Sequence, residues 1–162
     1  MTQLLVRPMT VADVDAVANL HVSTWRETYS GLIPQSFFAK DVVEYRRRWW
    51  SSTIADTEAD QVFRVAEIDG QLVGFAGAGV AVKEPAPRPL ELYMIYLAKA
   101  AHGSGIGQQL LDGVLPPVPA FLWVARDNPR ARAFYVKNGF VADGTEFTDP
   151  RTPDFVEMRM VR

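Results

Sequence analysis

The chain has 162 residues, of which 48% are hydrophobic and 22% charged, with a formal net charge of −2. This composition excludes a disordered chain, and the length fits one domain over residues 1–162. The acidic balance argues against general nucleic-acid binding, and the lack of cysteine excludes disulfides and thiolate catalysis. Residues 1–10 do not resemble a signal peptide and no apolar run suits a membrane span, so we expect a cytoplasmic protein.

Hydrophobic periodicity and turn residues divide the chain into short elements. In chain order they predict a strand at 3–7, helices at 10–24 and 34–54, strands at 61–68, 71–82 and 90–97, a helix at 106–114, a strand at 120–125, a helix at 128–138, and strands at 140–147 and 155–161. The second helix is expected to break near Lys40. This order predicts a mixed sheet with helices on its faces, an α/β (α+β) domain.

Local signals support individual boundaries. Thr10 and Asp13 are spaced nearly as in a capping box, which indicates the start of a helix. Asp69 and Gly70 between two strand patterns are typical of a tight hairpin. The segment 90–97, LELYMIYL, is apolar and aromatic throughout, as expected of a buried central strand.

Residues 46–50, RRRWW, combine basic and aromatic side chains. Such a combination is compatible with binding of single-stranded nucleic acid. We favour instead a helix that turns Val42, Tyr45 and Trp49 inward and leaves its arginines in solvent.

Three glycines, Gly103, Gly105 and Gly107, stand between a predicted strand and a predicted helix. A glycine-rich turn that opens a helix leaves unpaired backbone N–H groups pointing to one place, where the helix dipole favours negative charge. The turn therefore predicts a phosphate or pyrophosphate site. Gln108 stands where the P-loop needs lysine, and the glycine spacing does not fit the dinucleotide fingerprint.

Two motifs resemble the GNAT superfamily of N-acetyltransferases. Residues 102–107, HGSGIG, fit the pattern Q/R-x-x-G-x-G/A except at His102. The pattern N-x-x-A-x-x-F-Y-x-x-x-G-F is matched by Asn128, Ala131, Phe134, Tyr135, Gly139 and Phe140. Residues 25–34, WRETYSGLIP, further resemble a bacterial subgroup of this superfamily. The resemblance implies the GNAT fold, a mixed and mostly antiparallel sheet of about six or seven strands with helices on both faces.

The resemblance also implies how acetyl-coenzyme A binds. Backbone N–H groups of residues 103–108 would hold the pyrophosphate, and the backbone of residues 95–97 would bond the pantetheine arm and polarise the acetyl oxygen where its strand parts from a neighbour. The expected cofactor-binding residues are Ile95, Tyr96, Leu97, His102, Gly103, Ser104, Gly105, Ile106, Gly107, Gln108, Asn128, Ala131, Phe134 and Tyr135. Asn128 has the alternative of capping its helix alone. The segment 114–121, VLPPVPAF, shortens a connection and should affect the outer rim of the cofactor or an interface.

Acetyl transfer to an amine requires an acid for the leaving thiolate and a base for the amine. Tyr135 is expected to be the acid, because a phenol with a pKa of about 10 can protonate a thiolate at modest cost. The base is Glu91, His21 or a water molecule; His21 shares a helix stripe with Trp25 and Tyr29. Trp25, Tyr29 and Glu91 are expected to contact the acceptor.

The hypothesis is therefore an acetyl-CoA-dependent N-acetyltransferase that moves an acetyl group to a primary amine by direct attack in a ternary complex. The expected acceptor is an amine on a small molecule, peptide or protein, with no metal, nucleic acid or membrane involved. The exposed edges of a mixed sheet are compatible with a homodimer. The alternative is a non-catalytic GNAT-like module that binds acyl-CoA as a sensor or interaction domain; Tyr135 and Asn128 favour the enzyme.

Overall fold

A seven-stranded sheet forms the centre of the computed structural model, which describes residues 2–39 and 41–162. Its strands are β1 (Leu4–Pro8), β2 (Val62–Ile68), β3 (Gln71–Val80), β4 (Leu90–Leu97), β5 (Ala120–Ala125), β6 (Val141–Thr148) and β7 (Val156–Val161). Their order in space is β1-β2-β3-β4-β5-β7-β6, and every neighbouring pair is antiparallel except β4 and β5. The predicted mixed, mostly antiparallel sheet is confirmed.

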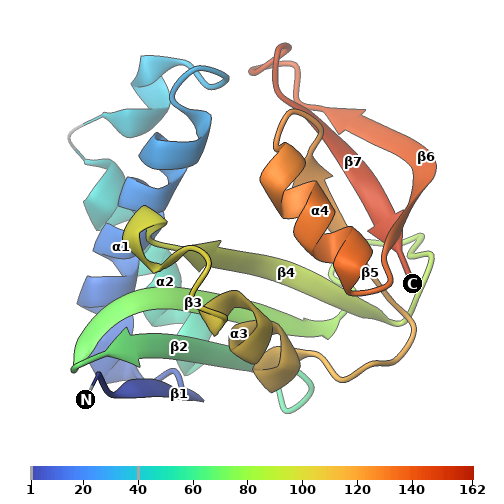
Figure 1. Ribbon diagram of the computed structural model, residues 1–162. Helices are drawn as coiled ribbons and strands as arrows, with labels where there is room; N and C mark the ends of the chain where they lie inside the picture. The colour runs from blue at the N-terminus through green and yellow to red at the C-terminus, as the bar shows by residue number, and fades with distance from the viewer. Residues whose placement is uncertain (1, 40) are drawn as a thin grey trace.

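Helices cover both faces of this sheet (Figure 1). They are α1 (Val14–Tyr29), α2 (Val42–Ala55), α3 (Ile106–Val114) and α4 (Pro129–Lys137). On one face, Val17 of α1 and Trp50 of α2 pack with Phe75 of β3. On the other face, Leu110 of α3 and Tyr135 of α4 belong to a second apolar core. Across the described residues, no helix is both long and apolar enough to cross a membrane.

Side-chain chemistry explains the first helix. The Asp13 carboxylate accepts hydrogen bonds from the Thr10 N–H at 2.8 Å and from the Thr10 hydroxyl at 3.0 Å, which fixes the chain where the helical segment starts. Arg7 of β1 pairs with the same carboxylate at 2.7 Å and so ties strand to helix. The helix then runs to Tyr29, beyond the predicted end near Thr24, because no glycine or proline interrupts it before Gly31.

The hairpin between β2 and β3 has the predicted turn. Asp69 and Gly70 have φ angles of 49° and 79°, the left-handed conformations that a type I′ turn requires at both central positions. Ile68 and Gln71 pair on either side of this turn. A two-residue signal in the sequence therefore sets the register of the two strands.

The predicted second helix consists of two parts. A 3-10 turn at Gln35–Phe38 precedes α2, and the break predicted near Lys40 lies outside the described residues. Trp50 is fully buried, whereas the exposed fraction of Tyr45 is 61%, so the prediction that Tyr45 turns inward is wrong. The helix is rotated so that Trp50 takes the core position against Phe75, at a ring distance of 5.5 Å.

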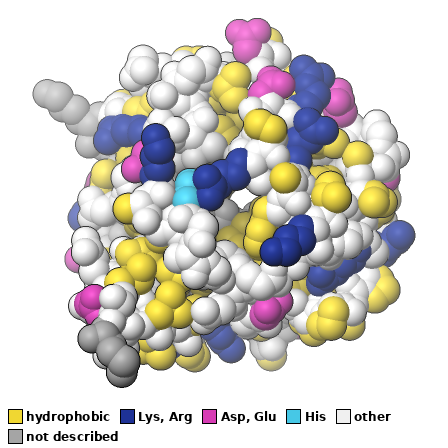
Figure 2. Space-filling view, in the orientation of Figure 1, with side chains coloured by type: hydrophobic (Ala, Val, Ile, Leu, Met, Phe, Trp, Pro, Cys, Tyr) yellow, Lys and Arg dark blue, Asp and Glu magenta, His cyan; other side chains and the backbone are white. Residues whose placement is uncertain are grey.

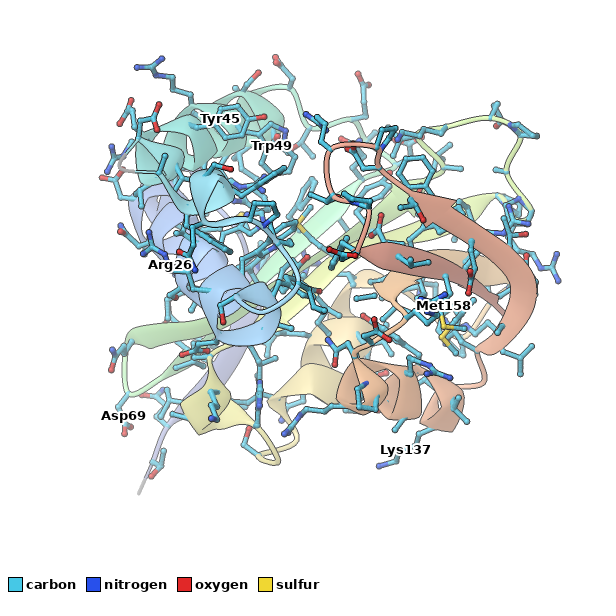
Figure 3. All side chains as sticks on the ribbon, turned by 90° about the horizontal axis from the view of Figure 1, so that it is seen from above. Arg26, Tyr45, Trp49, Asp69, Lys137 and Met158 are labelled. Atoms are coloured by element: carbon cyan, nitrogen blue, oxygen red, sulfur yellow. The ribbon has the colours of Figure 1, made fainter. Side chains whose placement is uncertain are left out.

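The arginines of the RRRWW segment lie among carboxylates and aromatic rings. Arg47 forms ion pairs with Asp15 of α1 and Glu44, and Arg48 pairs with Glu44. Arg46 lies over the ring of Trp25 at 5.4 Å. Tyr45 and Trp49 lie on the same helix (Figure 3), where Tyr45 is exposed and Trp49 is half-buried against the core, as predicted for Trp49. These contacts hold α2 against α1, as expected of a structural helix, but Arg46 is half-buried, so the prediction that all the arginines lie in solvent is wrong.

The central strand β4 contains an irregularity that shapes the site. Gly77 of β3 pairs with Met94 and Ala78 pairs with Leu92, so Tyr93 is an extra residue without a partner. This β-bulge makes both Tyr93 and Met94 pack on the α1/α2 side of the sheet. On its other edge, β4 pairs with β5 only over residues 90–92 and 120–122, and beyond these residues the strands part.

We expect Gly79→Ala to destabilise the sheet beside this bulge. Gly79 pairs with Glu91, and an added Cβ would lie 2.6 Å from the Asp60 carbonyl oxygen, a backbone atom that has little freedom to move. Urea denaturation should show a loss of about 1–3 kcal/mol in the free energy of unfolding. Gly31→Ala is the control, because its Cβ would meet nothing within 4 Å. Equal stability of the two variants would contradict this packing.

Candidate active site

A cavity of about 770 Å³ opens where β4 and β5 part. Its lining comes from both sides of the sheet: Tyr29 at the end of α1 and Tyr135 of α4 both contribute. The cavity therefore passes between the two strands and connects the α3/α4 face with the α1/α2 face. Figure 2 shows a hollow near the middle of the visible face, bordered by Lys and Arg side chains. Its volume is in the range of sites for small molecules.

The edge of β4 presents unpaired backbone amides to this cavity. The Ala98 N–H donates to the Val73 carbonyl at 2.8 Å, so it points toward β3. Successive amides of a strand point to opposite edges, and those of Leu97 and Ile95 therefore face the parted side. Tyr96, between them, turns its amide toward β3. Of the three predicted backbone contacts, two thus have an amide available to a ligand.

The glycine turn forms another part of the wall. Gly103 and Gly105 have φ angles of 78° and 86°, which side-chain-bearing residues rarely adopt, and Gly105 is the N-cap of α3. A Cβ at either glycine would meet nothing within 4 Å, so the space in front of the turn is open. The first N–H groups of α3 have no acceptor within the helix. This open cradle of donors at the positive end of a helix dipole fits a pyrophosphate.

Basic side chains also contribute to the cavity wall. Lys99, Arg130 and Lys137 all line it. Lys137 extends outward from the last turn of α4 (Figure 3). The ring Nε2 of His102 lies 3.2 Å from the Leu97 carbonyl oxygen, so the imidazole contacts the edge of β4. His102 stands where the family pattern has Gln or Arg. Positive charge at the cavity comes instead from Lys99, Arg130 and Lys137.

Tyr135 lies deep in the cavity wall, with an exposed fraction of 7%. Its ring packs edge-on against Phe134 and Phe140. Burial, with a smaller contribution from Tyr29, raises the pKa of the Tyr135 phenol, so it remains protonated at neutral pH. Asn128 begins the same helix: its side-chain oxygen accepts the Ala131 N–H at 3.2 Å, and it also lines the cavity. The capping contact is thus present.

His21 is separated from the other predicted catalytic residues. Its exposed fraction is 3%, it lies in an aromatic core, and it does not line the large cavity. Its Nδ1 accepts a hydrogen bond from the Trp50 indole at 3.1 Å. Burial, and secondarily the charge of Arg46, lower the pKa of His21 to about 3, so the ring is neutral. The stripe that it forms with Trp25 and Tyr29 is real, but only the latter two reach the cavity.

Three carboxylates line the cavity, those of Glu27, Glu91 and Glu157. Glu27, near the end of α1, is exposed and accepts a hydrogen bond from the Lys99 N–H at 3.2 Å. Glu91 is half-buried on β4 and accepts a hydrogen bond from the Val82 N–H at 3.3 Å. Glu157 is half-buried on β7, where it pairs with Ala125 of β5. Burial raises the pKa of Glu91 and of Glu157. The hydrogen bond from Val82 and the charge of Lys83 oppose this shift at Glu91, and the charge of Lys83 opposes it at Glu157. Glu157 was not predicted from the sequence, because a single glutamate in a strand pattern does not show which strand lies beside it.

The chain belongs to the Acetyltransferase (GNAT) family, whose model matches residues 15–140. A probable N-acetyltransferase of Mycobacterium tuberculosis is 26% identical, covering 91% of this chain and 85% of the relative. A spermidine N(1)-acetyltransferase of Thermoplasma acidophilum is 24% identical, covering 89% and 92%. The crystal structure of PaiA N-acetyltransferase from Thermoplasma acidophilum in complex with coenzyme A has a TM-score of 0.73 at 24% identity, covering 97% and 98%. The resemblance in the two motifs is confirmed, and the protein is an acetyltransferase of this family.

The buried, neutral His21 predicts a specific pH dependence of stability. Because its folded pKa of about 3 lies below the ordinary value, the unfolded chain takes up a proton below pH 6.5 that the folded chain does not. Stability is therefore lost as the pH falls from 6.5 toward 3. Between pH 7 and pH 5, wild type should lose about 2 kcal/mol more than His21→Phe in urea denaturation. His102→Asn, at an exposed histidine, should behave as wild type; a His21→Phe variant with the wild-type pH dependence would contradict this.

Proposed function

We propose that the protein transfers an acetyl group from acetyl-CoA to a primary amine by direct attack in a ternary complex. The observation that carries this proposal is the continuous cavity from the glycine turn, past Tyr135, to Glu91 and Glu157. A cavity that joins an anion-binding turn to carboxylates on the other face of the sheet has room for donor and acceptor together. Direct transfer also suits a chain without cysteine, the residue most suited to an acyl-enzyme.

The residues of the turn and of β4 would hold the donor. Backbone N–H groups of residues 103–108 would bind the pyrophosphate, with the rim residues Lys99, Arg130 and Lys137 adding positive charge. The amides of Ile95 and Leu97 would accept the pantetheine arm in the manner of an added strand and stabilise negative charge on the acetyl oxygen. When bound, acetyl-CoA supplies an acyl carbon already activated as a thioester.

Tyr135 would protonate the leaving sulfur. A buried phenol is protonated at neutral pH, and a thiolate formed in a dry cavity is a stronger base than one in water. Its position in the wall between the turn and the carboxylates supports this role. Asn128, which starts the helix carrying Tyr135, would fix the helix end through its capping hydrogen bond and remain within reach of the pantetheine amides.

The acceptor would enter from the α1/α2 face as a cation. Two half-buried carboxylates and the aromatic side chains of Trp25, Tyr29 and Tyr96 line that part of the cavity. Carboxylates and aromatic faces both attract an ammonium group. A relative that is named for spermidine, a polyamine, is consistent with such an acceptor. An ammonium must lose a proton before its nitrogen can attack, so a carboxylate of this face would also serve as base.

Release of coenzyme A thiol over a panel of primary amines tests this function. We expect thiol release that depends on the amine and is fastest with diamines and polyamines. The sensor alternative predicts that coenzyme A binds, as seen by calorimetry, without thiol release from any amine. That outcome would overturn the proposed activity while leaving the cofactor site intact.

Tyr135→Phe should lower kcat by about 100-fold, because general acid catalysis typically contributes at least this much. The affinity for coenzyme A should change by less than about threefold, since the ring and its packing remain. Thiol release and calorimetry measure the two quantities. Tyr45→Phe, at an exposed position of α2, is the matched control and should behave as wild type. An unchanged kcat in Tyr135→Phe would exclude the phenol as the acid.

A further inference from the structure

We propose that Glu157 is the catalytic base that accepts the proton of the acceptor ammonium. This inference rests on the proposed function and assigns the base to a residue on β7 in preference to Glu91 and His21. The argument uses the register of three strands, the face to which each side chain turns, and the surroundings of each carboxylate.

Strand register places Glu157 level with the reaction centre. In the parallel pair, Leu92 of β4 is level with Leu122 of β5. Because the bulge adds one residue to β4, three steps beyond this pair bring β5 to Ala125 and β4 to Tyr96, which lies between the two amides that face the cavity. Glu157 pairs directly with Ala125 across the antiparallel β5/β7 contact. It therefore stands across the parted strands from the Ile95 and Leu97 amides, which are proposed to bond the pantetheine arm and the acetyl oxygen.

Glu91 lies at the closed end of the same opening. It pairs with Phe121 of β5, within the three residue pairs that still join β4 to β5. Phe121 is four residues before Ala125, which corresponds to about 13 Å along a strand. The Glu91 carboxylate also accepts the Val82 N–H and so supports the loop between β3 and β4. Glu91 is thus better placed to hold a distant part of the acceptor than to take the proton of its reacting nitrogen.

The side chain of Glu157 turns to the acceptor face. Ala125 packs with Tyr29 of α1, whereas Met158 and Met160, the neighbours of Glu157 along β7, belong to the core under α3 and α4 or pack against it. Residues directly opposite on antiparallel strands turn to the same face. Glu157 therefore faces the α1 side, together with Tyr96, which packs with Tyr29 and Ala125.

The electrostatic surroundings agree with this placement. Burial is the main reason that the pKa values of Tyr29 and Tyr96 are raised, and the negative charge of Glu157 adds to both shifts. Two cations lie near Glu157: Lys83 of the β3–β4 loop, and Arg159, which is two residues further along β7 on the same face. The Arg159 side chain is paired with Asp143 at 2.7 Å. Burial outweighs Lys83 and raises the pKa of Glu157. A carboxylate with a raised pKa is a stronger base.

The proposed step balances as follows. The ammonium group of the acceptor gives one proton to the Glu157 carboxylate, and its nitrogen then forms the C–N bond with the acetyl carbon while the C–S bond breaks. The electron pair left on sulfur takes the proton of the Tyr135 phenol. The surplus proton still on the nitrogen restores the phenol, and the proton on Glu157 leaves to solvent.

Three variants separate the carboxylates: Glu157→Gln, Glu91→Gln and, as an exposed control, Glu58→Gln. The measurements are thiol release from pH 6 to pH 10 at saturating acetyl-CoA with the best amine of the panel, and coenzyme A affinity by calorimetry. E157Q should lose at least 100-fold in kcat at pH 7 with unchanged affinity for coenzyme A. Its remaining rate should rise about tenfold per pH unit, because only amine that is already neutral can react. E58Q should match wild type.

Glu91→Gln should raise KM for the amine and keep the wild-type pH profile. Glu157→Asp retains a carboxylate and tests the role independently of how well the glutamine variant folds: its kcat should fall while its pH profile stays that of wild type. Two outcomes would overturn this inference but not the proposed function. In the first, the wild type is active and kcat of E157Q is within threefold of it. In the second, the rate of E91Q, and not that of E157Q, rises about tenfold per pH unit. A wild type that binds coenzyme A without amine-dependent thiol release would overturn the proposed function and the inference with it.

Discussion

The separation of β4 from β5 after three residue pairs is the constraint on which the rest of the site depends. A sheet normally satisfies the N–H and C=O groups of an interior strand through both neighbours, and leaving them unpaired costs free energy. Here the bulge at Tyr93 shifts β4 and the partner strand diverges, so the amides of Ile95 and Leu97 have no strand to bond. In the proposed function, a ligand with its own amides would form the hydrogen bonds that β5 does not supply at this edge.

The same separation places opposite charges at the two ends of one cavity. The glycine turn at the start of α3 and Arg130 of α4 line one side of the cavity, and Glu91 and Glu157 lie toward the side covered by α1, while Lys99 and Glu27 of α1 meet at the rim. An anionic donor and a cationic acceptor would thus meet between the strands from opposite faces. In the proposed reaction, the electrostatic field of the cavity would orient each of them before any specific contact forms.

Local signals in the sequence predict local structure such as turns. They do not predict the surroundings of a side chain where these depend on contacts between distant segments. The hairpin at Asp69 and the glycine turn follow from residues that need particular backbone angles, and both are present. Periodicity places His21 on a helix stripe. It does not show that the indole N–H of Trp50, from another helix, donates a hydrogen bond to the His21 ring inside the core. Glu157 enters the cavity only through the register of β7 on β5, which no short pattern encodes.

The most direct test of this account is the response of backbone amides to coenzyme A, followed by NMR of ¹⁵N-labelled protein. The account predicts that the amide resonances of residues 103–108 and of Ile95 and Leu97 shift on titration, while that of Ala98, which bonds to β3, shifts less. Saturable binding that leaves the resonances of the glycine turn and the β4 edge unchanged would contradict it.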